Sequence, residues 1–324
     1  MFVDDEPRPI LPDSFLGGTA PRLGILRLMN ASFPGLPKLL LSTTHLTYLS
    51  LDDIPRSGYI PPEAMTTSLS VLTGLESLHH QFRYPPPRPA SSRHLPPLAR
   101  SILPRFTEIQ FKGASEYLEE ILALINAPRP NNLYITLFNQ IIFDTPQLFQ
   151  FISRRPTLME SKACRVTFSS EAIMAEFPIS LLESFRMDIR CTASEWQLSS
   201  LDQVFTSSLP PISTLESLCI VEDRFLSPRW QDHVENTLWL DLLRPFVAVK
   251  NLYLSTEYVP RIASALQELV GGRTTEVLST LENIFIQLFR PQGPLQEGIE
   301  KFVTAQQLTS RPVAVSRWRM MYGL

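Results

Sequence analysis

The sequence predicts an α/β fold in which one short strand and one helix are repeated many times along the chain. Three observations lead to this prediction. A phrase of the form L-x-x-L-x-L, with other apolar residues allowed at its three fixed positions, recurs along most of the 324 residues. Segments with helix signals lie between its copies. Hydrophobic residues make up 44% of the chain and charged residues 19%, which is enough apolar material for a large folded core.

The phrase predicts the strands. Its last two apolar positions are two residues apart, so both side chains point to one face of an extended strand and the residue between them points to the other. The spacing between successive copies is uneven. The clear copies are Leu23-Leu26-Leu28, Leu46-Leu49-Leu51, Phe106-Ile109-Phe111, Leu182-Phe185-Met187, Leu215-Leu218-Ile220, Val249-Leu252-Leu254 and Leu281-Ile284-Ile286, and the weaker ones are Leu75-Leu78 with His80 in the third position, Leu133-Ile135 and Val166-Phe168.

The segments between these phrases predict the helices. Residues 61–75 begin with prolines, which are harmless in a first helical turn, and have a glycine near their end. Residues 113–128 have an acidic first turn followed by apolar residues at helical spacing. Further helices are expected within residues 145–156, 194–210, 237–246, 258–272 and 295–308.

A repeated order of strand, loop, helix and loop with this strand phrase is the pattern of a leucine-rich-repeat solenoid. One repeat cannot bury its apolar face alone, so neighbouring repeats stack. Their strands then form a parallel β-sheet on the concave side, with helices on the convex side. We predict about nine or ten repeats of irregular length in residues 23–309, between part of a preceding repeat at 1–22 and a C-terminal tail at 310–324.

A Pro-rich insertion interrupts the repeats at residues 84–105, where seven of the 22 residues are proline. Such a run favours an extended or polyproline II conformation. Its segment RHLPPLAR faintly resembles a ligand of proline-reading modules. A surface insertion followed by a short repeat helix is the better explanation, because proline runs are more often loops.

Composition and charge exclude several classes of protein. The formal net charge of −3 gives no electrostatic reason to expect a nucleic-acid partner. The N-terminal residues lack the basic start and apolar run of a signal peptide, and no apolar run reaches the about eighteen residues of a membrane span. Cys164, Cys191 and Cys219 are too widely spaced for a disulfide framework. We therefore expect a protein of the cytoplasm, the nucleus or both, with no membrane partner.

Motifs that carry catalysis are missing from the sequence. It contains no phosphate-binding loop, dinucleotide fingerprint, nucleophile elbow or H-E-x-x-H motif. The histidines have no Cys or His neighbours at zinc-site spacing, and the adjacent His79 and His80 point to opposite faces of a strand. We expect no catalytic residues, no metal site and no cofactor. An enzyme with an unrecognised site remains an alternative, and it requires a deep polar pocket with convergent titratable groups.

The strand face that the apolar pairs leave free is the expected binding surface. Tyrosine and arginine side chains on it combine a large contact area with a polar tip, as interface anchors do. The alternative for each single residue is a merely solvated face. The candidate contact residues are Tyr48, Asp52, His79, Glu108, Gln110, Tyr134, Arg165, Arg186, Asp188, Cys219, Asn251, Tyr253, Asn283 and Phe285.

Three stretches of the chain resemble the leucine-rich region of fungal F-box-type proteins of mushroom-forming fungi. They are FLGGTAPRL with the following LPKLLLSTTHLTYLSLDDIPRSGYIPPEAMTTSLSVLTGLESL, then WQDHVENTLWLDLLRPFVAVKNLYLSTEYVPRIASALQELVGGRT, and finally GIEKFVTAQQLTSRPVAVSRW. The resemblance extends from about residue 10 to residue 318. It implies that an F-box docks on a Skp-type adaptor of a cullin ubiquitin ligase while the repeats present a protein substrate.

The start of this chain departs from that plan. The residues before the first predicted strand are too few for a helical F-box, so we expect the chain to begin inside the solenoid. The edge of the strand near Leu26 and Leu28 is then expected to be unpaired. A Skp-type adaptor is expected as partner only if an upstream F-box exists. The alternative function is a stand-alone repeat scaffold with no ubiquitin-ligase connection.

Overall fold

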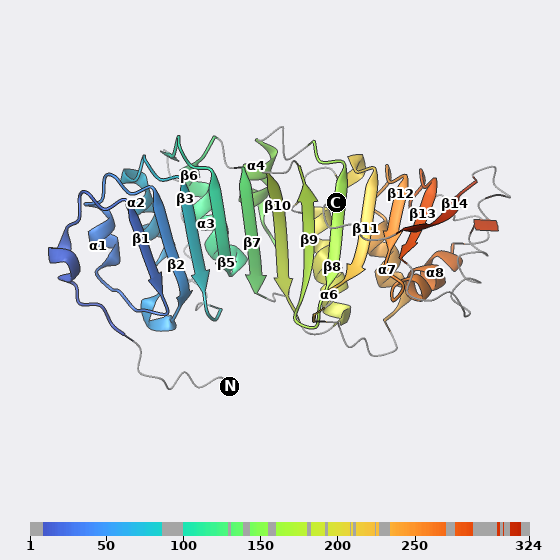
Figure 1. Ribbon diagram of the computed structural model, residues 1–324, viewed down its shortest axis with the longest axis horizontal. Helices are drawn as coiled ribbons and strands as arrows, with labels where there is room; N and C mark the ends of the chain where they lie inside the picture. Colours follow the sequence, from blue (N-terminus) through green and yellow to red (C-terminus); the bar gives the residue numbers. More distant parts are fainter. Residues whose placement is uncertain are drawn as a thin grey trace. The chain divides into compact units, whose positions relative to one another are not determined.

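A computed structural model gives the structure of the chain. It describes residues 9–85, 100–128, 131–138, 143–154, 160–179, 183–191, 194–207, 209, 212–223, 225–226, 234–269, 276–287, 303–304, 307 and 312–318. The chain forms two compact units, of which the first comprises Met1–Phe138 and Asp144–Arg155 and the second Asn139–Phe143 and Pro156–Leu324. Both units contain strands and helices, so the α/β class is confirmed (Figure 1).

The strands of the first unit all pair in parallel. Their order follows the chain, from β1 through β2, β3 and β5 to β7. The strands are β1 (Ile25–Met29), β2 (Tyr48–Ile54), β3 (Ser77–Phe82), β5 (Glu108–Gly113) and β7 (Asn132–Phe138), with the short parallel pair β4 (Ser101–Ile102) and β6 (Ile125–Asn126). The helices are α1 (Leu36–Leu40), α2 (Pro62–Val71), α3 (Ser115–Leu124) and α4 (Pro146–Ser153), with 3₁₀ turns η1 (Phe15–Gly18) and η2 (Arg56–Gly58).

The second unit has a mixed sheet. Its strand order is β10-β9-β8-β11-β12-β13-β14. The strands are β8 (Ala163–Phe168), β9 (Ala172–Pro178), β10 (Ser184–Arg190), β11 (Ser217–Glu222), β12 (Asn251–Leu254), β13 (Asn283–Gln287) and β14 (Ala314–Trp318). The helices are α6 (Ser194–Ser207), α7 (Asn236–Leu243) and α8 (Val259–Gln267), with the 3₁₀ turn η3 (Ile212–Thr214).

The prediction of a wholly parallel sheet is wrong at β9, which pairs antiparallel with both β8 and β10. The cause is the turn between β8 and β9, where the Ser169 amide donates to the Ala172 carbonyl at 2.9 Å. A parallel return needs a crossover of a dozen or more residues, and this turn is far too short for one. The phrases that end at Phe168 and Met187 are therefore not neighbours, because β9 lies between their strands. The described sheets are mostly, not wholly, parallel.

The predicted strand phrases all fall on strands, and most residues of their apolar pairs are buried in the core, with Leu28 and Ile286 half-buried. Leu49 and Leu51 of β2 are buried, and so are Leu218 and Ile220 of β11. In both units the helices lie on one side of the strands (Figure 1). Of the named phrase residues, Leu182 lies outside the described residues. Alternation with period two thus assigned the faces of the strands correctly.

The predicted helices between residues 61 and 272 are present as α2, α3, α4, α6, α7 and α8. The helix expected within residues 295–308 lies almost entirely outside the described residues, as do residues 86–99 of the Pro-rich insertion. Residues 314–318, which we placed in a C-terminal tail, form β14 and pair in parallel with β13. In the described part of the chain, no helix is long and apolar enough to cross a bilayer.

The first strand lies at one end of the strand order. Among the described residues, no strand pairs with the outer edge of β1. Ile10 forms an isolated bridge with Ser32 beyond the end of this strand. The expectation of an unpaired edge near Leu26 and Leu28 is met within this part of the chain.

Candidate functional site

The candidate site is the strand face that the helices leave uncovered, which we call the open face of each unit. Because neighbouring parallel strands are in register, residues at equivalent positions form rows across this face. In the first unit one row consists of Arg27, Ser50, His79, Gln110 and Tyr134. The predicted contacts His79, Gln110 and Tyr134 are therefore direct neighbours.

A polar network crosses three strands of the first open face. The Tyr48 hydroxyl on β2 lies 3.0 Å from Nδ1 of His79 on β3. Nε2 of His79 lies 3.6 Å from Oε1 of Glu108 on β5. Ser77 donates a hydrogen bond of 2.5 Å to the other carboxylate oxygen of Glu108. The network holds three of the predicted contact residues in one fixed arrangement, which reduces the side-chain entropy that a partner must remove on binding.

Arg27 extends this network and was missed in the sequence. Its guanidinium carbon lies 4.6 Å from the centre of the Tyr48 ring, which is cation–π geometry. Arg27 stands between Leu26 and Leu28, in the position that Ser50 takes on the next strand. The other contact residues were chosen because they flank the inward-pointing apolar residues of a strand phrase. Arg27 meets the same criterion. Asp52, a predicted contact, accepts a 2.5 Å hydrogen bond from Ser50 on its own strand.

The open face of the second unit also carries a row of aligned side chains. Six of its members extend from β10 across β9, β8, β11 and β12 to β13, and β14 adds the seventh. Two of the predicted contacts in this region, Arg186 and Asp188, bind each other through two hydrogen bonds of 2.9 Å. The row consists of Arg186, Glu176, Arg165, Cys219, Tyr253, Phe285 and Ser316.

Three aromatic side chains meet on this face, and we call them the aromatic cluster: Tyr253, Phe285 and Trp318. The Tyr253 and Phe285 rings are stacked, with centres 4.5 Å apart and planes at 11°. The Trp318 ring lies 5.3 Å from Tyr253 at 78°, and its Nε1 donates to the Leu254 carbonyl at 3.4 Å. All three side chains are half-buried, so each keeps part of its surface in solvent. The sequence analysis missed Trp318 because β14 was not predicted.

A pair of amides lies beside the aromatic cluster. Asn251 and Asn283 are register partners on β12 and β13. Nδ2 of Asn283 donates to Oδ1 of Asn251 at 2.9 Å. This bond uses one donor and one acceptor, so the pair keeps further hydrogen-bonding capacity for a partner. Both predicted contacts thus lie next to the aromatic rings.

Cys219 is half-buried between two register partners, Arg165 and Tyr253. Burial raises the pKa of its thiol to about 11, although Arg165 acts in the opposite direction. The thiol is therefore protonated at neutral pH and a poor nucleophile. All three cysteines of the chain are free. This agrees with a contact role for Cys219, and not with a redox centre.

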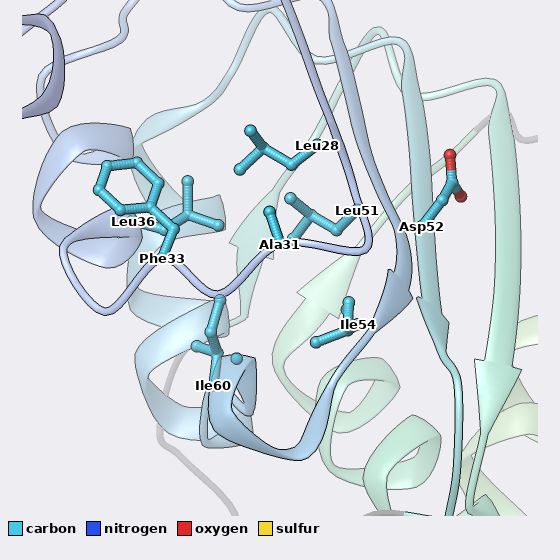
Figure 2. A pocket seen from close by; sticks show the side chains of 9 residues that line it. Leu28, Ala31, Phe33, Leu36, Leu51, Asp52, Ile54 and Ile60 are labelled. Atoms are coloured by element: carbon cyan, nitrogen blue, oxygen red, sulfur yellow. The ribbon is translucent and has the colours of Figure 1, made fainter. Parts of the chain in front are cut away.

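The small cavity in Figure 2 is not a ligand site. It lies behind β1 and β2, is lined mainly by apolar side chains, and has a volume of about 10 Å³. That volume holds about one water molecule. In Figure 2, Leu51 points into this region while Asp52 stands on the other side of the strand. Neighbouring residues of β2 thus point to opposite faces of the sheet, as the period of two predicts.

His80 confirms the same alternation from inside the core. It is only 1% exposed and stacks on Tyr117, with ring centres 5.2 Å apart and planes at 7°. The Phe82 ring meets it edge-on at 4.8 Å. Burial lowers the pKa of His80 to about 3, so the ring is neutral at ordinary pH. His79 lies on the open face, so the two histidines point apart as predicted.

Both open faces carry polar side chains that are hydrogen-bonded to neighbouring side chains. Within the residues that the structure describes, no group of three His, Cys, Asp or Glu side chains could hold a metal ion. In the first unit Ser77 donates to the Glu108 carboxylate, and in the second unit Arg186 and Asp188 bind each other. No family model matches the chain, and no curated protein matches its sequence.

Proposed function

We propose that the chain is a non-catalytic protein-recognition module, built as a leucine-rich-repeat solenoid, that binds a partner protein on its open face. The observation that carries this proposal is the aromatic cluster. Half-buried Tyr253, Phe285 and Trp318 lie together on a strand surface. Aromatic side chains grouped in this way, with a hydrogen-bonding rim, have the properties of interface hot spots.

The surroundings of the aromatic cluster support binding specificity. Arg165 and Cys219 continue its row, and the Asn251–Asn283 pair flanks it. Arginine and amide side chains supply directional hydrogen bonds, while the stacked rings supply buried apolar area. The polar network of Tyr48, His79 and Glu108 provides further pre-arranged contacts on the first unit.

The resemblance to fungal F-box-type proteins gives the proposal its biological form. We propose that the module is the substrate-binding arm of a ubiquitin-ligase receptor in the cytoplasm or the nucleus. The three free cysteines suit such a reducing compartment. A Skp-type adaptor is a partner only if an F-box precedes the repeats. A stand-alone scaffold with no ubiquitin-ligase connection is the second candidate.

Replacing Tyr253 and Phe285 together by alanine is expected to weaken partner binding by about 2 kcal/mol or more, because the main apolar anchor is removed. The full chain is used to capture partners from host cells, and one reproducible partner is then purified for a binding titration. Trp196→Ala is the matched control, since Trp196 is a large aromatic on α6 with 52% exposure. Equal affinity of the double variant and the wild type contradicts binding at the open face.

The ligase role has its own test, which does not depend on the identity of the substrate. The natural full-length protein is expected to bind a purified Skp-type adaptor if an F-box precedes the repeats. Titration of the adaptor against that protein measures this directly. Failure to bind contradicts the ligase role and leaves the scaffold candidate in place.

A further inference from the structure

A groove on the helices of the second unit is large enough for a ligand. Its volume is about 630 Å³, within the usual size of binding pockets. The groove is lined by the C-terminal part of α6, by the end of α7 and, between them, by Leu209, Ile212 and Ser213. It is built from helices and their ends, so it is separate from the strand face to which we assign recognition.

The floor of the groove is apolar and firmly held. Phe205, Leu209 and Ile212 line it, and all three side chains are buried. The Phe205 ring also packs edge-on against Phe246, with centres 5.3 Å apart at 87°. A floor tied to the core in this way keeps its shape without a ligand, so it is ready to accept an apolar side chain.

The rim of the groove has more negative than positive charge. Asp241 is bound by Arg244, whose Nη1 lies 2.8 Å from its carboxylate. Asp202 is half-buried, and no hydrogen bond or ion pair to its carboxylate occurs among the described residues. Burial, and then the charge of Asp241, raises the pKa of Asp202, while Arg244 lowers it. Two carboxylates therefore share one cation.

The hydroxyl of Thr206 does not compensate Asp202. It donates to the backbone carbonyls of Asp202 and Gln203, at 2.8 and 3.2 Å, so its proton stays within the helix. A half-buried carboxylate without a bound cation is unfavourable in the free protein. An incoming cation removes this unfavourable term, which makes Asp202 the point of strongest attraction in the groove.

We infer that this groove binds a segment of a partner protein in which a lysine or arginine side chain stands beside an aliphatic or aromatic one. The cation lies against Asp202, and its apolar neighbour lies on the floor formed by Phe205, Leu209 and Ile212. Charge complementarity selects the cation, since the rim carries one excess negative charge. The apolar floor selects a peptide segment, because a free inorganic cation leaves that floor exposed.

The test selects random peptides displayed on phage against the full chain, with counter-selection against the Asp202→Asn variant. We expect the enriched peptides to share a lysine or arginine next to an apolar residue. An enriched peptide is then synthesised, and its affinity is measured by fluorescence anisotropy. Asp202→Asn is expected to weaken binding about tenfold or more, the effect of losing one charge-assisted hydrogen bond. Glu195→Gln is the matched control, since Glu195 is an exposed acid on the same helix, and its binding is expected to stay unchanged.

Two further measurements keep the outcome clear. The Asn variant removes a half-buried charge, so its thermal unfolding midpoint is expected to equal or exceed that of the wild type. Arg244→Gln removes the competing internal cation and is expected to strengthen peptide binding several-fold. Peptides that lack a cation, or that bind the wild type and Asp202→Asn equally, overturn the inference. It is also overturned if free agmatine displaces the peptide with the same affinity, or if the groove mediates dimers of this chain that Asp202→Asn dissociates.

This inference stands apart from the proposed function. Tyr253 and Phe285, whose removal tests the open face, do not line the groove. If the open-face variant keeps its partner while Asp202→Asn loses its peptide, the proposed function fails and the groove remains. If the open-face variant loses its partner while Asp202→Asn keeps its peptide, only the inference about the groove fails.

Discussion

Replacing His80 with leucine is expected to raise the free energy of unfolding by about 1 kcal/mol at neutral pH. Both ring nitrogens of His80 are buried and have no hydrogen-bond partner among the described residues. An unsatisfied buried polar group costs about 1 to 3 kcal/mol. Loss of the stacking on Tyr117 offsets about 0.5 to 1.5 kcal/mol of the gain. Leucine is the usual residue at this third position of the strand phrase, so it fits the space between the helices and the sheet.

The advantage of the leucine variant is expected to grow as the pH falls. The folded chain leaves His80 neutral down to a pKa of about 3, whereas an ordinary histidine in the unfolded chain has a pKa near 6.5. Between these values the unfolded chain binds a proton that the folded chain does not. The free energy of unfolding therefore falls by about 1.4 kcal/mol for each unit by which the pH is lowered. At pH 4 this effect lowers the free energy of unfolding of the wild type by about 3 kcal/mol. The His80→Leu variant has no such loss.

Urea denaturation of both proteins at several values between pH 7 and pH 4 measures this difference. Other titrating groups are common to the two proteins, so they cancel in the comparison. His45→Gln, which changes an exposed histidine, serves as the control and is not expected to show the widening gap. If the wild type and His80→Leu lose stability in parallel as the pH falls, His80 is not a neutral buried histidine.

The alternation of side chains along each strand could be read from the sequence because it depends on backbone geometry alone. It placed His80 inside and His79 outside, and it brought Tyr48, His79 and Glu108 to one face. Contacts between strands depend on the register, which the parallel pairing of β2, β3 and β5 fixes. The hydrogen bond between His79 and Tyr48 and the proximity of His79 to Glu108 are consequences of that register.

The elements that were missed lack the strand phrase. Strand β9 has Ile173, Ala175 and Phe177 at a period of two, and all three are buried. A search for alternation alone would find it, whereas a search for L-x-x-L-x-L does not. Its antiparallel direction depends on the tight turn at Ser169, which is a local effect. Strand β14 has exposed Val315 in place of a buried apolar residue, so nothing in its pattern distinguishes it from a tail.

The groove in the second unit could not be predicted at all. It exists because the end of α6 and the end of α7 pack side by side, which brings Asp202 close to Asp241. Helix ends are placed by tertiary packing and by the loops between them, and neither follows from periodicity.

Replacing Trp239 with alanine is expected to lower the free energy of unfolding by about 3 to 5 kcal/mol, the range for removing a large buried aromatic side chain. Trp239 is fully buried in α7 and lies 5.7 Å from Phe168 of β8 and 5.8 Å from Tyr258, measured between ring centres. Phe168 and Tyr258 are themselves 5.1 Å apart. Removal of the indole therefore opens a cavity shared by a strand, a helix and the residue that precedes α8.

Denaturation in urea, followed by far-UV circular dichroism, measures this loss, and Trp239→Phe keeps the prediction testable if the alanine variant does not fold. The phenylalanine variant keeps one aromatic ring at position 239, in contact with Phe168 and Tyr258. Its loss in the free energy of unfolding is therefore expected to be about half as large. Tyr253→Ala on the open face is the matched contrast, because its half-buried ring gives up less contact and costs about 1 kcal/mol. A loss below about 1 kcal/mol for Trp239→Ala contradicts a packed core at this position. Together these variants separate the two sides of the sheet, since Trp239 lies in the core and Tyr253 lies on the open face.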